Sequence, residues 1–577
     1  MRRAEKNTAV TAFQSNRFYT VVSAPAIAVL LLLFFMPLLI ILSRGFISDE
    51  GRFTLGLITE ALGDPYILRV IVFTIIQSAV STAGALAIGL PGAYLLSHYS
   101  FRGKRLVQAV ATIPFILPSI LVVLGFVIFY GNTGVLNTIL MKLFNLSEPP
   151  VRVLYSFKAI ILAHTFYNFP IILSIVANYW QQLPLRPEQA AQSLGATKAH
   201  IFRTITLPRL LPAIISASTL VFLFCFSSFA ILLVLGGGPQ FTTLEVEIYQ
   251  RARMAGDISG SSALAMISIF IALILVTFYS ISQQKMKGSE EISSSQVHRE
   301  PRRMKSPLMR VFISFYILFT VIFILGPLLS ITYRSLFAQV SRTGPMVFSL
   351  DNYRILFSSM SDGTNTSLLS IFNSVLIAFG ASFISVTLGV LLSSRIVSGR
   401  RKDRVILEVS AMLPMVVSSV TLGLGYYMIS VISSRWNINR ILFVVLAHVV
   451  ITSPFVLRSI LPTYRRIPAS YQMASLTLGA SASRTFWKID LPLLRNALAS
   501  AGAFGFAISM GELQATLTLS DSRIITLPIT MYRLIGSYNF AAACALGTIL
   551  MGVCIMIFLS IEYLKKGEVQ HGFSSHF

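Results

Sequence analysis

The polar stretch Glu188-Gln-Ala-Ala-Gln-Ser-Leu-Gly195 recurs 284 residues later as Gln472-Met-Ala-Ser-Leu-Thr-Leu-Gly479. The first copy continues to Ile205-Thr-Leu-Pro208 and the second to Ile489-Asp-Leu-Pro492, so that the proline follows the glycine by 13 residues in both. Each copy interrupts a sequence that is otherwise strongly apolar. A spacing kept at two distant places indicates that one structural part is present twice in the chain.

The composition around these stretches is that of a membrane protein. Of the 577 residues, 55% are hydrophobic and 12% are charged, whereas a soluble domain carries about 25% charged residues. Apolar runs long enough to cross a bilayer recur along the whole length. We therefore expect an all-α polytopic membrane protein with about twelve transmembrane helices, at roughly 20–42, 70–97, 106–130, 155–179, 210–235, 261–281, 308–332, 369–394, 405–432, 440–461, 495–519 and 540–562.

The net charge of +24 is explained by membrane topology rather than by nucleic acid. Basic clusters fall at the termini and in alternate loops, for example Arg102, Lys104 and Arg105, and again Arg400, Arg401 and Lys402. This is the positive-inside pattern, which predicts that both termini are cytoplasmic. The expected partner of the basic loops is therefore membrane lipid, and no nucleic-acid partner is expected.

The repeat divides the chain into two homologous halves of six helices each. Residues 1–285 form the first half, with its polar loop at 184–209, and residues 308–577 form the second, with its loop at 468–493. The polar stretch 286–307 is expected to be a cytoplasmic linker. Because six helices return the chain to the side on which it began, the halves have the same orientation, and a pathway is expected between them.

The residue types in the first loop predict a short surface helix. Pro187 suits the first helical position, and Glu188 favours the positive end of the helix. Gly195 permits a left-handed turn after the helix, and Pro208 begins the next membrane helix. A helix lying against lipid headgroups is the alternative interpretation of one such loop, but two copies at equal spacing favour a docking element.

These residues resemble the EAA loop of permease subunits of ATP-binding-cassette (ABC) importers. The residues that match its pattern are Ala190, Ala191, Gly195, Ile205, Leu207 and Pro208 in the first copy, and Ala474, Gly479, Ile489, Leu491 and Pro492 in the second. Gln189 takes the place of the glutamate, with Glu188 just before it, and Met473 and Ser475 also depart from the pattern. The departures leave open whether both loops bind equally strongly.

The resemblance implies the type I ABC importer permease fold, in which each loop is a coupling helix docked on an ATPase subunit. It implies an ABC ATPase dimer and a periplasmic or lipoprotein substrate-binding protein as partners, in the bacterial cytoplasmic (inner) membrane. The sequence contains no Gly-x4-Gly-Lys-[Ser/Thr] phosphate loop. We therefore expect that the chain binds no cofactor, is not itself an enzyme, and relies on ATP hydrolysed by its partner.

The substrate is indicated only by resemblance. The segments Cys225-Phe-Ser-Ser-Phe-Ala230, Leu235-Gly-Gly-Gly-Pro-Gln240, Thr242-Thr-Leu-Glu-Val-Glu-Ile-Tyr249 and Leu534-Ile-Gly-Ser-Tyr538 look like those of thiamine importers. Thiamine or a related cation is the expected cargo, with ferric iron or a polyamine as the alternative. A twelve-helix secondary transporter is disfavoured, because its repeated motif would follow the second helix of each half rather than the fourth.

A few polar residues lie inside the apolar runs and are candidates for the translocation pathway. Glu512 is acidic and lies well inside a predicted span, where it could meet a cation or serve as a helix-packing partner. Ser227 and Ser228 occupy the corresponding place in the first half, and Tyr167 and Asn168 lie in its fourth helix. His164 and His448 match across the repeat, which favours a structural role. The three cysteines and the scattered acids show no metal-ligand spacing, and no catalytic residues are expected.

Overall fold

The computed structural model describes residues 2–46, 52–293, 302–303, 306–339, 346–358, 366–399, 401–521 and 524–571. Within these ranges, eleven helices are long and apolar enough to cross a membrane, and a twelfth span is obtained if one bent helix pair counts as a single crossing. This confirms the expected all-α polytopic architecture.

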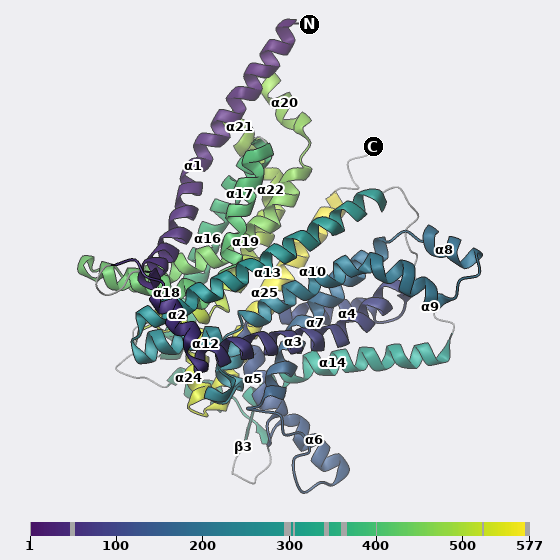
Figure 1. Cartoon of the computed structure of the whole chain (residues 1–577), viewed down its shortest axis with the longest axis vertical. Coiled ribbons are helices and arrows are strands. Elements are labelled where there is room, and N and C mark those ends of the chain that lie inside the picture. Colours follow the sequence, from purple (N-terminus) through teal and green to yellow (C-terminus); the bar gives the residue numbers. More distant parts are fainter. Residues whose placement is uncertain are drawn as a thin grey trace. The chain divides into compact units, whose positions relative to one another are not determined.

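The helices pack into two units. Unit 1 contains residues 1–47, 354–537 and 548–577, and unit 2 contains residues 48–353 and 538–547. Unit 1 is built from helices α1 (Arg2–Phe46), α16 (Thr366–Ser398), α17 (Arg401–Met412), α18 (Ser419–Ile432), α19 (Arg440–Arg466), α20 (Ala469–Thr477), α21 (Ala482–Thr485), α22 (Leu491–Met510), α23 (Gln514–Leu519) and α24 (Leu527–Gly536), with most of α15 (Asp351–Ser358) and α25 (Phe540–His571) (Figure 1).

Unit 2 has the helices of the first half other than α1, together with α14 from the second half. They are α2 (Gly56–Gly63), α3 (Pro65–His98), α4 (Lys104–Ile116), α5 (Ser119–Tyr130), α6 (Val135–Phe144), α7 (Phe157–Gln182), α8 (Arg186–Ser193), α9 (Lys198–Ile201), α10 (Leu207–Phe226), α11 (Ala230–Leu235), α12 (Leu244–Gln250), α13 (Ile258–Ser293) and α14 (Pro307–Leu336). Two short strand pairs accompany them. Strand β1 (Tyr99–Ser100) is parallel to β2 (Arg302–Arg303), and β3 (Phe337–Gln339) is antiparallel to β4 (Met346–Phe348).

The first long helix of each half packs with helices of the other half of the sequence. Helix α1 belongs to unit 1, where the Tyr426 hydroxyl of α18 donates a hydrogen bond of 2.7 Å to the Leu33 carbonyl. Helix α14 belongs to unit 2, where the Tyr316 hydroxyl donates to the Ile88 carbonyl of α3 at 3.2 Å. The packing units thus differ from the two halves of the sequence repeat. Unit 1 includes α1 from the first half, and unit 2 includes α14 from the second half, with residues 337–353 and 538–547.

Small residues allow the central helices of each unit to approach closely. A Cβ at Gly89 would lie 2.7 Å from the Ile172 Cβ, and one at Gly389 would lie 3.0 Å from the Val456 Cγ1. In both units the glycine therefore sets the contact between the second long helix and the fourth, which is the small-residue packing expected of helices in lipid.

The third predicted span of each half is broken. The expected helix at 106–130 is two helices, α4 and α5, separated at Leu117-Pro118. A residue before proline is disfavoured in helical conformation, and proline has no N–H to continue the hydrogen-bond ladder. In the second half, Asp403–Met415 and Ser419–Trp436 meet at a bend of 89°. Continuous hydropathy concealed both breaks.

The fifth predicted span is also interrupted, at equivalent places in the two halves. The expected helix at 210–235 ends at Phe226 and resumes as α11, and that at 495–519 ends at Met510 and resumes as α23. Interrupted helices inside a bilayer are tolerated where protein or a water-filled cavity satisfies the freed backbone groups.

Of the linker expected at 286–307, residues 286–293 continue helix α13, and α14 begins at Pro307. Residues 294–301 and 304–305 of that linker lie outside the described ranges.

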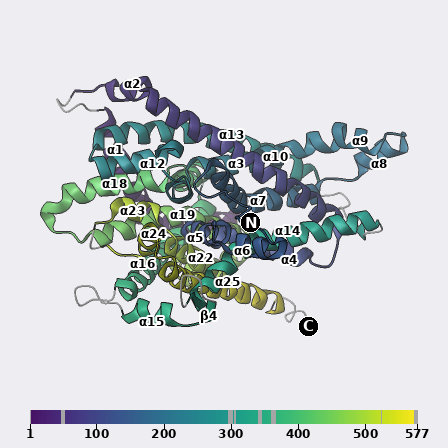
Figure 2. The same cartoon turned by 90° about the horizontal axis from the view of Figure 1, so that it is seen from below.

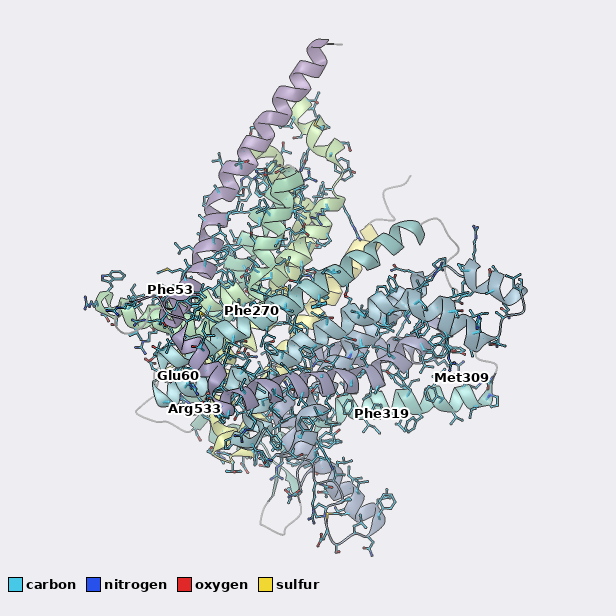
Figure 3. The ribbon with its side chains drawn as sticks, viewed as in Figure 1. Phe53, Glu60, Phe270, Met309, Phe319 and Arg533 are labelled. Atoms are coloured by element: carbon cyan, nitrogen blue, oxygen red, sulfur yellow. The ribbon has the colours of Figure 1, made fainter. Side chains whose placement is uncertain are left out.

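The outer sides of the long helices carry large apolar side chains. Phe270 on α13 is 65% exposed (Figure 3), and on α16 Phe379 and Phe383 are 65% and 67% exposed. Such residues would be costly in water but are the expected surface of helices that face lipid tails.

Candidate functional site

The first polar loop folds as the sequence predicts. Helix α8 ends at Ser193, and Gly195 adopts the left-handed conformation with φ of 83°. Behind it, the Leu194 N–H donates to the Ala190 carbonyl at 3.1 Å and the Ala196 N–H donates to the Ala191 carbonyl at 3.0 Å. These bonds satisfy carbonyls at the end of the helix, as in a glycine-terminated C-cap.

The second loop has the same backbone geometry. Helix α20 is followed by Gly479, whose φ is also 83°. The Leu478 N–H donates to the Ala474 carbonyl at 3.0 Å, and the Ala480 N–H donates to the Ser475 carbonyl at 3.1 Å. Two sequences that share only part of their residues therefore build one turn.

Each loop is joined directly to the membrane helix that follows it. Short helix α9 runs through a π-helical turn, η1 (Phe202–Thr206), into α10, which has Pro208 in its first turn. In the second half, α21 runs through the π-helical turn η6 (Phe486–Asp490) into α22, with Pro492 in the first turn. The end of each loop is thus connected to the fifth helix through continuous helical backbone.

Both loops expose an apolar tip. Leu194 is 88% exposed and Leu478 is 87% exposed, and within the described chain no residue of α8 or α20 is buried. A hollow of about 550 Å³ lies beside the second tip, lined by Tyr471, Leu478, Lys488 and Pro492 among others.

The loops differ in the side chains that hold them to their membrane helices. In the first, the Thr206 hydroxyl donates to the Glu188 carboxylate at 2.9 Å. In the second, the Gln472 amide donates to the Asp490 carboxylate at 2.9 Å. Because these positions correspond across the repeat, the acid lies on the short helix in one half and at the start of the long helix in the other.

Glu512 lies at the interruption of the fifth helix in unit 1. Its Oε1 accepts a hydrogen bond of 2.8 Å from the Ala515 N–H, so the carboxylate caps α23. In unit 2 the corresponding interruption contains Ser227 and Ser228, and the Ser227 hydroxyl donates to the Leu223 carbonyl at 2.9 Å. The structure thus places these three candidates at matching breaks in their respective units.

The two repeat-matched histidines differ in how fully they are paired. His448 contacts Ser509 through Nδ1 at 2.7 Å and Thr516 through Nε2 at 2.8 Å. His164 contacts Ser81 through Nδ1 at 3.0 Å, but its buried Nε2 has no hydrogen-bond partner among the described residues. Both side chains are buried, which places them in the packing of the fourth helix.

The side chains of Tyr167 and Asn168 make contacts in different parts of unit 2. The Asn168 amide donates to the His164 carbonyl at 2.9 Å and contacts the Cys225 sulfur at 3.4 Å, inside unit 2. The Tyr167 hydroxyl instead donates to the Leu117 carbonyl at 3.3 Å, at the break between α4 and α5. The two side chains therefore reach different helices of unit 2.

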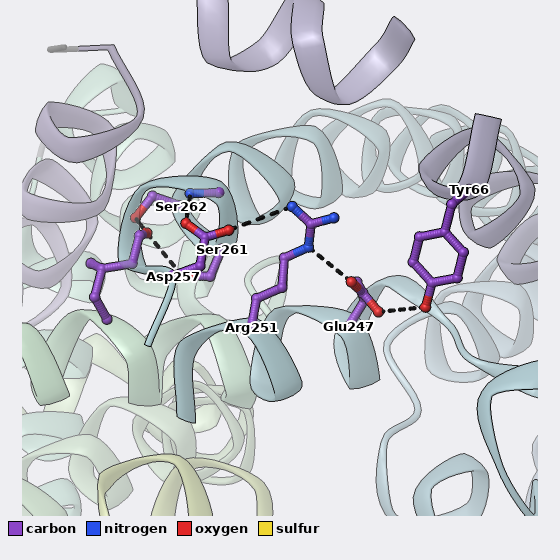
Figure 4. Close-up of polar contacts among 8 residues, drawn as sticks. Tyr66, Glu247, Arg251, Asp257, Ser261 and Ser262 are labelled. Carbon is purple, nitrogen blue, oxygen red and sulfur yellow. Dashed lines mark hydrogen bonds and ion pairs between the residues drawn. The ribbon is translucent and has the colours of Figure 1, made fainter. Parts of the chain in front are cut away.

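A carboxylate network that sequence reasoning missed lies around α12. This helix is at the opposite end of unit 2 from α8 (Figure 1; Figure 2). Glu247 accepts from the Tyr66 hydroxyl at 2.9 Å and from the Arg251 guanidinium at 2.8 Å, and Arg251 lies 3.5 Å from Asp257 (Figure 4). Glu245, fully buried, accepts from the Ser268 hydroxyl at 2.8 Å.

The charges of this network compensate one another. Partial burial lowers the pKa of Arg251. The hydrogen bond and charge of Glu247, together with the charge of Asp257, raise it by more, so the pKa of Arg251 is raised overall. Two acids spaced two residues apart in an apolar segment were the available signal in the sequence. Among the described residues, no group of three or more His, Cys, Asp or Glu is arranged to hold a metal ion.

The chain is similar to known membrane transport proteins. The family model described as "Binding-protein-dependent transport system inner membrane component" matches residues 85–288 and again 385–563. The thiamine transport system permease protein ThiP of Haemophilus influenzae is 26% identical over 507 residues, covering 88% of this chain and 90% of that protein. ThiP of Escherichia coli K12 is 28% identical over 517 residues, covering 88% and 91%.

A second kind of relative has a similar level of identity. The ferric transport system permease protein FbpB of Actinobacillus pleuropneumoniae is 26% identical over 562 residues, covering 96% of this chain and 79% of that protein. The duplicated match and the fused-length relatives confirm the resemblance drawn from the two polar loops.

Proposed function

This chain belongs to the family of binding-protein-dependent transport system inner membrane components, and from that premise we propose that it is the fused permease subunit of an ATP-driven importer of thiamine. The single observation that carries the coupling role is the identical turn in the two loops, each with an exposed leucine and a left-handed glycine. One chain then supplies both contacts that a dimer of ATPase subunits requires.

The proposed mechanism follows from how the loops are attached. Closure of the ATPase dimer on ATP displaces α8 and α20, because their exposed tips are held by the ATPase. The π-helical turns η1 and η6 continue into α10 and α22, so each displacement moves a fifth helix and the break within it. Alternation between two packed states then opens the pathway to one side of the membrane at a time.

Thiamine as cargo is supported by two considerations. The fused-length relatives in Haemophilus influenzae and Escherichia coli are thiamine permeases. Glu512 also places a carboxylate at a helix break, where it would attract a cation such as the thiazolium ring. A charge inside a membrane span is costly, and a cationic substrate would offset part of that cost.

Ferric iron is the alternative cargo, favoured by the ferric permease relative that matches 96% of this chain. For either cargo we propose an external substrate-binding protein, periplasmic or lipoprotein, and a location in the bacterial inner membrane with both termini cytoplasmic. The basic clusters near Arg102 and Arg401 support that orientation.

The proposal is tested with the chain co-purified with an ABC ATPase and a substrate-binding protein from the same genome. Proteoliposomes should accumulate labelled thiamine only when ATP is enclosed on the loop side and the binding protein is present on the other side. Ferric iron and polyamines serve as competing substrates. Uptake driven by an ion gradient without ATP would contradict the proposal, and so would failure of any ATPase to bind the chain.

A further inference from the structure

One buried carboxylate in unit 1 joins four structural elements. Asp490 is the last residue of the π-helical turn η6 and is fully buried. Its Oδ2 accepts from the Tyr19 hydroxyl of α1 at 2.8 Å and from the Tyr464 hydroxyl of α19 at 2.7 Å. Its Oδ1 accepts from the Gln472 amide of α20 at 2.9 Å. The side chain thus links the first helix of the chain to the second coupling loop.

The energetics of burial make this arrangement demanding. Taking a carboxylate out of water costs several kcal/mol unless hydrogen bonds replace the lost hydration. Hydrogen bonds to an ionised acceptor are roughly twice as strong as neutral ones, and Asp490 receives them from three side chains in the described part of unit 1. The loss of the acceptor would leave the buried Tyr19 and Tyr464 hydroxyls only each other as a side-chain partner among the described residues.

Aromatic packing holds the same elements together. The Tyr19 ring lies edge-on to Phe486 of η6 with their centroids 6.3 Å apart, and Phe18 lies 6.4 Å from the same ring. Phe486 and Tyr19 belong to one buried cluster with Val456 of α19. Helix α1 is therefore packed on the turn that begins α22, and the carboxylate fixes its orientation there.

The first half has different residues at the positions that match this network. Thr206 stands where Asp490 does, and Trp180 stands where Tyr464 does. The Trp180 ring N–H is buried and has no hydrogen-bond partner among the described residues. Helix α14 is aligned with α1 through two prolines: Pro327 packs against Gly125, as Pro37 packs against Gly425. In this alignment, Met309 of α14 takes the position of Tyr19 (Figure 3). A thioether cannot donate a hydrogen bond.

We propose that Asp490 is a positioning residue that makes α1 move with the second coupling loop. The inference rests on the proposed function and adds that the two loops transmit force unequally. When the ATPase displaces α20, the Asp490 contacts carry α1 along with α22, whereas in the first half α8 moves α10 with Thr206, not an acid, at the matching position. Conversely, a loosened α1 would let the second loop move without moving its bundle.

The test compares transport with ATP hydrolysis in the complete complex. In Asp490→Asn the shape is kept but the charge is lost, and an amide N–H₂ replaces one acceptor. We expect the number of thiamine molecules imported per ATP to fall about tenfold, the factor that corresponds to one charge-assisted hydrogen bond of about 1.5 kcal/mol. ATP hydrolysis and ATPase co-purification should remain. Thr206→Ala, the matched change in the first loop, should lower the ratio by less.

Two further variants remove only a hydroxyl and guard against misfolding of the Asn variant. Tyr19→Phe and Tyr464→Phe should each lower the ratio, and Tyr19→Phe should add little to Asp490→Asn, because both remove one contact. An unchanged ratio in Tyr19→Phe, or an equal loss in Thr206→Ala, would overturn the proposal.

Hydrogen exchange supplies a readout independent of transport. In Asp490→Asn, amides of 469–490 and of 18–25 should exchange faster together, whereas those of 186–206 should not change. Faster exchange in 469–490 alone would refute the link to α1. If instead the wild-type complex imports nothing with ATP, the proposed function fails, and the exchange result still decides the link.

Discussion

Replacement of Gly479 tests whether the left-handed turn is what the coupling loop requires. The glycine has φ of 83°, a conformation that costs other L-residues about 1–2 kcal/mol. No described heavy atom lies within 4 Å of a Cβ built at Gly479. The cost of Gly479→Ala is therefore the backbone cost alone, because the added methyl group meets no described neighbour.

The magnitude predicts a graded series. Asparagine tolerates the left-handed region. For alanine the conformation has the free-energy cost given above, and for valine the cost is larger because its branched Cβ is strongly disfavoured there. At about 1.4 kcal/mol per tenfold, the correctly turned loop becomes about tenfold rarer relative to its alternatives in Gly479→Ala. We expect import to decrease in the order Gly, Asn, Ala, Val.

The assay is ATP-dependent thiamine uptake in proteoliposomes, with the amount of bound ATPase measured in the same preparation. Gly195 has the same φ and the same open surroundings, so the series at Gly195 should have the same order. Equal loss in Gly479→Asn and Gly479→Val would refute the backbone argument and would instead indicate that any side chain collides with the docked ATPase.

Three further predictions concern other parts of the units. Glu512→Gln keeps an oxygen that accepts from the Ala515 N–H but removes the charge, so cation uptake should fall about tenfold, about 1.4 kcal/mol, while the complex still assembles; wild-type uptake would dismiss the pathway role. Leu194→Ser and Leu478→Ser each remove an exposed apolar tip, so each should lower ATPase retention on affinity purification, and full retention in both would contradict docking at these tips. Leu232 stands at the position of Thr516, so Leu232→Thr should give the His164 Nε2 a hydroxyl partner like the one that His448 has, and the melting temperature of this variant should be no lower than that of Leu232→Val, whose side chain has the same shape as threonine. A clearly higher melting temperature for the valine variant would show that the nitrogen is already satisfied.

The loops were predictable from the sequence because their determinants are local. A glycine that must adopt positive φ and a proline at the start of a helix keep their spacing in both copies, even where Met473 and Ser475 replace the pattern residues. The apolar runs also located the membrane spans, since length and hydropathy are properties of one segment. What these signals share is independence from distant contacts.

The helix breaks and the exchanged first helices were not predictable in this way. Leu117-Pro118 lies in a strongly apolar run, and the segment from Gly511 to Leu513 contains only one charged residue, Glu512, within an apolar span. An average of hydropathy over a window of span length therefore hides both interruptions. The packing of α1 in unit 1 depends on contacts such as Tyr426 to Leu33, which join residues far apart in the chain. The hydrophobic periodicity of the sequence carries no information about which distant residues form such a pair.

The fusion of the two halves into one chain allows them to differ at matching positions. In a homodimer a substitution at one loop necessarily appears at the other, so a buried acid at the Asp490 position would have to suit both. In this chain the two positions hold different residues, Thr206 and Asp490, and each has a neighbour that suits it: Glu188 accepts from the hydroxyl, and Gln472 donates to the carboxylate. The same reasoning applies to His164 and His448.

Exchanging the loop pairs should reveal this dependence, because Thr206→Asp would place two carboxylates, Glu188 and the new one, within hydrogen-bond distance. Their repulsion should weaken ATPase binding at the first loop, and adding Glu188→Gln should restore it. Failure of that second change to restore binding would show that the surrounding packing, rather than the pair, determines which acid each half accepts.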